Sequence, residues 1–141
     1  MANLEAAQDI QDRTRRLLTR VVHGPHTRTP SPPGSPPAMI SGSLAASVQA
    51  EHDGDDAIVG PTASARSKNG PYGRFLELGG THTGHTAKGM SWIEDGQWYR
   101  MHEISKAERP YLAPATDDAV HSGAISRIYY DHWLIAQQAA T

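Results

Sequence analysis

The chain has 141 residues, of which 38% are hydrophobic, ten are prolines and thirteen are glycines. A chain of this length is expected to form one domain, with part of it spent on loops. Thirteen Lys plus Arg against fifteen Asp plus Glu give a net charge of −2, which argues against a nucleic-acid binder with a strongly basic surface. The absence of cysteine excludes disulfides, thiol catalysis and Cys-ligated metal or iron–sulfur sites.

Two features of the sequence bear on membranes and targeting. No apolar run is long enough to cross a membrane. The first residues, Met1-Ala2-Asn3-Leu4-Glu5, are acidic, whereas a secretory signal begins with basic residues and continues into an apolar stretch. We therefore expect a soluble protein of intracellular origin that does not bind a membrane.

The first segment is predicted to be an amphipathic helix with Asn3 as its N-cap and Gly24-Pro25 as its stop. Its apolar residues recur at steps of three and four, namely Leu4, Ala7, Ile10, Thr14, Leu17, Leu18 and Val21. Its second half is basic, with Arg13, Arg15, Arg16 and Arg20. A surface helix lying on a core is the simplest interpretation, and a helix that binds nucleic acid or a membrane is the alternative.

Thr29–Pro37 is a proline-rich stretch, Thr-Pro-Ser-Pro-Pro-Gly-Ser-Pro-Pro. Because proline lacks an amide donor and favours extended neighbours, neither a helix nor a central strand is expected there. We predict a semi-rigid connector in polyproline form, which would span about 28 Å at about 3.1 Å per residue. A ligand for a proline-recognition domain would have a similar composition, but a spacer is the commoner role.

Short elements are expected after the connector. Ser43–Glu51 and Ala57–Val59 are predicted strands, and Asp53-Gly54 between them supplies the positive φ of a hairpin turn. Tyr72–Leu78 is short and apolar between glycines, which favours one or two helical turns. Gly79–Gly89 is too rich in glycine for regular structure, so we expect a mobile loop that becomes ordered against a partner.

The last part of the chain contains a second hairpin and a helix. Met90–Glu94 and Gln97–Ile104 are predicted to pair around Asp95-Gly96. Pro114–Ala139 is predicted to be one long helix. The apolar face of that helix would consist of Val120, Ala124, Ile125, Ile128, Tyr129, Trp133, Ile135 and Ala136.

The predicted fold class is therefore α+β, with N-terminal and C-terminal helices packed on a small antiparallel sheet of about four strands. A Pro-rich arm and a Gly-rich loop complete this architecture. Within a single domain, residues 1–24 would form the N-terminal helix, residues 25–40 the connector and residues 41–141 the α+β core.

The residues that could carry chemistry do not form a convincing site. His82-x-x-His85 could share a metal with a third ligand such as His102 or Glu103, but the pair lies in a glycine-rich loop and no His-Glu-x-x-His pattern is present. There is also no Gly-x-Ser-x-Gly nucleophile motif and no phosphate-binding glycine motif. We predict no catalytic residue, no metal site and no cofactor, and thus a protein that is not an enzyme.

Four segments nevertheless occur in an order that is informative. They are Pro36-Pro37-Ala38-Met39-Ile40-Ser41-Gly42-Ser43-Leu44-Ala45-Ala46-Ser47-Val48, Ile58-Val59-Gly60, Tyr72 through Glu77-Leu78-Gly79, and Arg109-Pro110-Tyr111-Leu112-Ala113-Pro114-Ala115. This set resembles, over about residues 1–138, the head–tail joining (tail-completion) family of tailed phages that is named after the tenth gene product of a lambdoid siphophage. The chain departs from that family's pattern at Gly73, where Ala is commoner, at Leu78, where an aromatic is usual, and at the extra Gly80.

The resemblance implies a structural virion protein that is assembled in the host cytoplasm into the phage neck. It implies a homo-oligomeric ring, with six copies favoured and twelve possible, that connects the portal side to the tail tube. Its neighbours would be head-completion (stopper), tail terminator and tail tube proteins, and DNA would pass through the lumen without sequence-specific binding. The structural or interface candidates that follow from the motifs are Gly42, Leu44, Tyr72, Glu77, Gly79, Arg109, Pro110, Tyr111 and Pro114.

Three points stay open at this stage. Arg109 is expected to pair with a carboxylate such as Glu77. The aromatic residues either face neighbouring subunits or fill the core, and they are Trp92, Trp98, Tyr99, Tyr111, Tyr129, Tyr130 and Trp133. The Pro-rich arm either carries the N-terminal helix to the next subunit or doubles back so that the helix packs on its own chain.

Two other functions are compatible with parts of the sequence. One is a small metal-dependent enzyme that uses His82, His85 and His102. The other is a regulatory module that binds nucleic acid through the four arginines of the first helix, in which case its binding should weaken steeply with salt.

Overall fold

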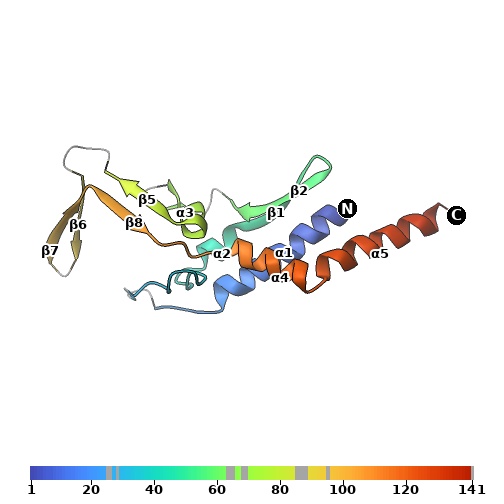
Figure 1. Ribbon diagram of the computed structural model, residues 1–141, viewed down its shortest axis with the longest axis horizontal. Coiled ribbons are helices and arrows are strands. Elements are labelled where there is room, and N and C mark those ends of the chain that lie inside the picture. Colours follow the sequence, from blue (N-terminus) through green and yellow to red (C-terminus); the bar gives the residue numbers. More distant parts are fainter. Residues whose placement is uncertain are drawn as a thin grey trace.

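The computed structural model describes residues 1–24, 27, 29–62, 66–67, 70–84, 89–94 and 96–140. These residues form an elongated molecule (Figure 1). Its helices α1 (Ala2–Thr19), α4 (Leu112–His121) and α5 (Ala124–Ala139) lie toward one end, and a two-stranded ribbon projects at the other. The small core lies between them.

Helix α1 starts earlier and ends earlier than the sequence suggested. Met1 is its N-cap, so the expected N-cap role of Asn3 is wrong. The Asn3 side chain instead donates to the Asp55 carbonyl oxygen at 2.7 Å and accepts a hydrogen bond from the Tyr129 hydroxyl at 2.6 Å. The helix ends at Thr19 rather than at Gly24-Pro25, because Val22 leaves it to form a parallel bridge with Met39.

The Pro-rich arm doubles back, so α1 packs on its own chain. The bridge is held by the His23 amide, which donates to the Met39 carbonyl, and the Met39 amide, which donates to the Val21 carbonyl, both at 2.8 Å. The buried residues of α1 are Ala6, Ala7, Thr14 and Leu18, and this face lies against the first hairpin and the C-terminal helices. Of the two arrangements left open by the sequence, the structure has the one within a single chain.

The segment predicted as the strand Ser43–Glu51 is a helical turn followed by a strand. Helix α2 (Ser43–Ser47) begins after Gly42, whose φ of 77° lies in the left-handed region that favours glycine. Strand β1 (Val48–Asp53) follows directly. Ala45, Ser47 and Val48 are buried whereas Ala46 is exposed, so Leu44, Ala46 and Val48 do not share one buried face as the predicted strand would require. Strand β1 pairs with β2 (Asp56–Pro61) from Val48 opposite Pro61 to Asp53 opposite Asp56, which confirms the predicted turn.

The middle of the chain contains β3 (Arg66–Ser67), β4 (Gly70–Pro71), α3 (Gly73–Leu78) and β5 (Gly80–Thr83). The short helix was predicted. The prediction of no regular structure over Gly79–Gly89 is wrong for the strand β5, while residues 85–88 of that loop, including Lys88, lie outside the described residues. That this loop becomes ordered on assembly stays a prediction.

The ribbon consists of β5 paired with β8 (Glu103–Lys106) and of β6 (Met90–Glu94) paired with β7 (Gln97–Met101). The predicted hairpin is confirmed, but its second strand stops at Met101 and the chain continues as β8. On one side of the ribbon, β7 and β8 are joined by the single residue His102; on the other side, β5 ends at Thr83 and β6 begins at Met90. The two sides are linked at this point by the Gly84 amide, which donates a hydrogen bond to the His102 carbonyl oxygen at 2.8 Å.

Two glycines allow the backbones to meet at this point in the ribbon. A Cβ at Gly84 would lie 2.7 Å from the Gly89 Cα, and a Cβ at Gly89 would lie 2.6 Å from the Met101 carbonyl oxygen. Gly89 also has a φ of 71°, which disfavours any other residue. Gly84 and Gly89 thus allow a close crossing of backbones at this point.

The expected single helix over Pro114–Ala139 is two helices, α4 and α5. The break lies at Gly123, whose φ of 75° ends α4 in the left-handed region. No residue of α5 is fully buried, so most of the apolar face predicted for this segment does not lie in the core. Trp133, for example, is 53% exposed, which makes the core alternative wrong for this residue.

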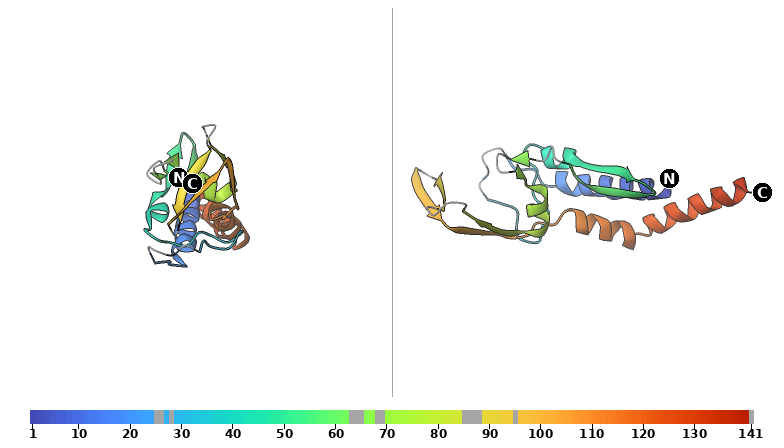
Figure 2. Two further views of the ribbon diagram at one scale, coloured as in Figure 1. Left: turned by 90° about the vertical axis from the view of Figure 1, so that its left-hand side faces the viewer. Right: turned by 90° about the horizontal axis from the view of Figure 1, so that it is seen from above.

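The fold class is α+β, as predicted, although the strands form four separate antiparallel pairs instead of one sheet of four. The core is a cluster of Leu18, Ala45, Val48 and Tyr111, with Leu44, Val59, Leu76 and Leu112 packed against it. Seen from above in Figure 2, α1 lies beside the first hairpin and α4 continues from the base of the ribbon. Helices α1, α2, α3 and α4 and strands β1 and β2 thus contribute side chains to this core.

Candidate functional site

The motif residues of the sequence converge on one junction, built around the carboxylate of Glu77. Its Oε2 accepts hydrogen bonds from the amides of Tyr111 and Leu112 at 2.8 and 2.9 Å, and its Oε1 accepts one from the Ala113 amide at 2.8 Å. These are amides at the start of α4, which have no partner within the helix. A negative charge there also complements the helix dipole. Glu77 therefore caps α4 from a helix 34 residues earlier in the chain.

Arg109 binds a different part of the junction from the one we expected. Its Nε donates to the Ser31 carbonyl at 2.7 Å and its Nη1 to the Ala107 carbonyl at 3.2 Å, so the expected pairing with Glu77 is wrong. Its backbone amide donates to the Leu76 carbonyl at 2.6 Å. Arg109 therefore ties the Pro-rich arm and α3 to the segment before α4.

Tyr111 is the largest side chain of the core and is 1% exposed. Burial raises the pKa of its phenol, and the negative charge of Glu77 contributes in the same direction. A Cβ at Gly73 would lie 2.9 Å from the Tyr111 hydroxyl and 2.8 Å from the Pro61 Cγ. The packing of Pro61 and Tyr111 therefore leaves no room for a Cβ at Gly73.

The remaining motif residues surround this junction. Gly79 has a φ of 63°, and a Cβ on it would lie 2.8 Å from both the Lys106 carbonyl oxygen and the Glu108 amide. Pro110 and Pro114 are half-buried, and Pro114 lies in the first turn of α4, where its missing amide costs no helical hydrogen bond. These residues fix the direction in which the chain leaves the ribbon and enters α4.

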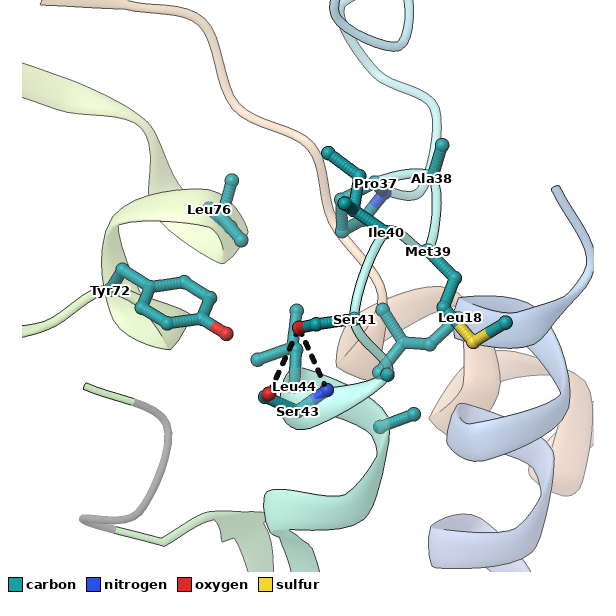
Figure 3. A pocket seen from close by; sticks show the side chains of 12 residues that line it. Leu18, Pro37, Ala38, Met39, Ile40, Ser41, Ser43, Leu44, Tyr72 and Leu76 are labelled. Atoms are coloured by element: carbon teal, nitrogen blue, oxygen red, sulfur yellow. Dashed lines mark hydrogen bonds between the residues drawn. The ribbon is translucent and has the colours of Figure 1, made fainter. Parts of the chain in front are cut away.

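Beside the junction lies an apolar groove of about 240 Å³. Figure 3 shows its lining, which comes from the end of α1, the segment before α2, α2 itself, and α3 with its N-cap residue. The lining side chains include Leu18, Met39, Ile40, Leu44, Tyr72 and Leu76. The Ser41 hydroxyl lies 2.9 Å from the Ser43 hydroxyl at one wall. Ile40 is 55% exposed, so the groove is open to an apolar side chain from outside. Gly42 and Leu44, both predicted candidates, thus lie at this groove.

Large apolar side chains are exposed at both ends of the molecule. On the ribbon these are Ile93, Trp98, Tyr99 and Met101, and on α5 they are Tyr129, Tyr130, Trp133 and Ile135. A soluble monomer rarely leaves such groups clustered in water. Most of these aromatic residues were interface candidates in the sequence, but their spacing does not distinguish core from surface positions. The side chain of Trp92 lies outside the described residues.

The histidines considered as metal ligands lie mostly outside the part of the chain that the structure describes, and this includes the side chain of His82. His85 is outside it, and His102 lies at the junction of β7 and β8. Among the described residues, no group of three or more histidines and carboxylates is placed to hold a metal ion.

Two of the four arginines in the basic half of α1, Arg13 and Arg15, are turned onto the chain itself, whereas Arg16 and Arg20 are exposed. Arg13 forms ion pairs with Asp9 and Asp118, and these hydrogen bonds raise the pKa of its guanidinium. Arg15 donates to the Val48 carbonyl at 2.7 Å. These two arginines therefore hold α1 against α4 and β1 rather than presenting a cationic stripe.

The comparisons with known proteins provide no relative. No protein-family model, no curated protein and no solved structure matches this chain. Within the described residues, no helix has the length and apolar character needed to span a membrane. The likeness to the phage family accordingly rests on the motif residues of the sequence alone.

Proposed function

We propose that this chain is a structural protein of a tailed-phage neck, which assembles into a ring and joins the portal side of the head to the tail tube. The protein is not an enzyme in this proposal and needs no cofactor. It would be assembled in the host cytoplasm and retained in the virion. Head-completion, tail terminator and tail tube proteins would be its neighbours.

The surface of the isolated chain is the observation that carries this proposal. Its accessible area is 9,910 Å², about 2,800 Å² more than the roughly 7,100 Å² expected for a compact monomer of 15.3 kDa. The buried hydrophobic residues among those described are Ala6, Ala7, Leu18, Ala45, Val48, Tyr111, Ala115 and Ala119, most of them alanines. A chain with so small a core and so large a surface is typical of a subunit that completes its burial in an assembly.

The contacts between the motif segments support the family resemblance. The segment Tyr72–Gly79 and the segment Arg109–Ala115 meet through the three hydrogen bonds to Glu77. The first motif segment contributes Leu44 to the same core, and the second contributes Val59. Segments that were recognised only by their order in the sequence are therefore neighbours in space, as expected for the signature of one fold.

The state of the arginines is compatible with DNA passing through the ring without tight binding. Arg13 and Arg15 are engaged within the chain, which lowers the number of cations available to phosphates. Each additional phosphate contact would slow the movement of DNA during ejection. We therefore expect weak and sequence-independent contact with DNA.

The proposal is tested with phage particles whose genome encodes this chain. Mass spectrometry of purified virions should detect the chain, and cryo-electron microscopy of the neck should show it as a ring, with six copies favoured over twelve. Deleting its gene should yield filled heads and tails that do not join. Infectious virions that lack the chain, or a neck in which no ring fits it, would refute the proposal.

A further inference from the structure

The two exposed apolar surfaces of this molecule are different in kind and lie at opposite ends. We define the ribbon patch as Ile93 and Trp98 with their neighbours Ser91 and Arg100. We define the α5 stripe as Tyr129, Tyr130 and Trp133 between Ser126 and Gln137. Figures 1 and 2 both place the tip of the ribbon and the end of α5 at opposite ends of the long axis. One chain of this shape cannot cover either surface with the other.

The ribbon patch occupies one face of an isolated hairpin. Ile93 pairs with Trp98 and Ser91 pairs with Arg100 in the β6–β7 register, so directly opposed residues share a face. Trp98 is 73% exposed and Ile93 is 57% exposed. A two-stranded hairpin is marginally stable by itself in water, and burying one apolar face against another element would stabilise it.

The α5 stripe is an aromatic surface on a helix that projects beyond its own support. The helix is tied to α1 near its middle, where the His132 Nε2 lies 2.7 Å from a Glu5 carboxylate oxygen. Ser126, Tyr130, Trp133 and Gln137 follow one another at steps of three and four, so they line one side of α5. The rings of Tyr130 and Trp133 have centroids 6.0 Å apart and form a ready-made aromatic surface.

We propose that the ribbon patch of one copy docks on the α5 stripe of the next copy, head to tail. This deepens the proposed ring and rests on it for closure, since two different patches at opposite ends generate a ring or an open filament. Trp98 and Ile93 would pack on the rings of Tyr130 and Trp133. Arg100, on the same ribbon face, would supply the cation that aromatic faces attract.

The area supports a second copy as the occupant. If one ribbon patch, one α5 stripe and their surroundings remove the excess surface of about 2,800 Å², each interface falls in the range of about 2,000–5,000 Å² that permanent interfaces bury. Each copy contributes one surface of each kind, so every copy in a closed ring is satisfied in the same way. A small ligand could not cover an area of this size.

The experiment uses the absence of native cysteine. Ser91→Cys places a thiol on the ribbon patch and Ser126→Cys places one on the α5 stripe. Both serines are exposed, and cysteine is nearly isosteric with serine. The single variants are mixed at about equal concentration and treated with a short bis-maleimide crosslinker. Cross-linked dimers should form in the mixture and not with either variant alone. Dimers that form equally well with Ser91→Cys alone would overturn the proposal, because like patches would then meet.

A chain carrying both substitutions distinguishes a head-to-tail series from a two-fold pair. The expected result is a ladder of cross-linked species beyond the dimer, ending at the copy number of the ring. A product that stops at the dimer, or a chain that remains monomeric at concentrations of about 100 μM, would overturn the proposal.

Truncation of the tryptophans gives a second, independent measurement. Trp98→Ala or Trp133→Ala should weaken self-association at least about 30-fold, which corresponds to a hot-spot loss of about 2 kcal/mol. Ile58→Ala is the matched control, because Ile58 is an exposed apolar residue on β2 outside both patches. Sedimentation should show unchanged association for this control and unchanged circular dichroism for all variants. Equal effects of the control and the tryptophan variants would contradict the assignment.

The outcomes separate this inference from the proposed function. A neck ring that contains the chain but gives no Ser91–Ser126 crosslink would refute the docking surfaces and leave the neck function standing. A chain that gives the expected ladder but is absent from virions would refute the neck function and leave the docking surfaces standing.

Discussion

The carboxylate of Glu77 offers the clearest test of what holds this fold together. Glu77→Ala would leave three amides at the start of α4 without their acceptor. Losing a helix cap costs about 1–2 kcal/mol, and losing a negative charge at a helix N-terminus costs about 0.5 kcal/mol more. We expect a decrease of about 2 kcal/mol in the free energy of unfolding, which is a large share of the stability of a small domain.

Urea denaturation followed by circular dichroism measures this change. With a slope of about 2 kcal/mol per molar urea, the midpoint should fall by about 1 M. Glu77→Gln keeps one acceptor oxygen and should have an intermediate effect. Glu103→Ala, an exposed carboxylate on β8, is the matched control and should remain within about 0.5 kcal/mol of the parent. If Glu77→Ala were as stable as this control, the carboxylate would not be the cap that the geometry indicates.

Three further substitutions test the same region and the helix break. Because the pKa of Tyr111 is raised, its contribution to stability is fully present below the unfolded-state pKa of about 10 and is lost as the pH rises above that value. Tyr111→Phe should therefore lessen the loss of stability at alkaline pH, measured by urea titrations at a series of pH values. An identical pH profile for the variant and the parent would contradict this. Gly73→Ala should lower the melting temperature because its Cβ would overlap Pro61 and the Tyr111 hydroxyl, whereas Gly60→Ala, which has open space, serves as control. Gly123→Ala should cost about 1 kcal/mol in thermal unfolding, since its φ of 75° is unfavourable for alanine, and a neutral result would mean that α4 and α5 can rearrange at no cost.

Elements defined by local turn chemistry were predictable from the sequence. Asp53-Gly54 was expected to form a hairpin turn, and the β1–β2 register has its turn there. The short helix α3 was also expected from its position between glycines. The strand predicted over Ser43–Glu51 is confirmed from Val48 onward and wrong over Ser43–Ser47, which form α2. The alternation of Leu44, Ala46 and Val48 favours a strand, but a short apolar stretch fits the helical period as well.

The mispredictions that span longer segments concern features that residue patterns along a single sequence do not reveal. The helix predicted over Pro114–Ala139 runs across Gly123, and an isolated glycine is tolerated in many helices, so only the left-handed conformation reveals the break. The predicted hairpins formed locally but, among the described residues, no strand pairing joins them into one sheet, and turn signals in a sequence do not reveal whether hairpins pair with one another.

The candidate site was predictable in its members but not in its contacts. Glu77 and Arg109 were both selected, yet a carboxylate is satisfied equally well by a guanidinium or by the first amides of a helix, and the structure has the second arrangement. The apolar face assigned to the C-terminal helix was recognised, but a periodic pattern does not say whether the face meets a core or another molecule. Trp133 belongs to such a face and is exposed.

The ribbon leaves and rejoins the rest of the chain at nearly one point. The Arg109 amide donates to the Leu76 carbonyl at 2.6 Å, and Gly79 lies against the backbone of Lys106 and Glu108. Among the described residues, those from Gly80 to Ala107 contribute no side chain to the core cluster, so the ribbon is a long excursion of the chain whose two ends meet at the junction. Selection can therefore lengthen, shorten or resurface this excursion two residues at a time, preserving strand register, while the junction beneath it continues to fold as before.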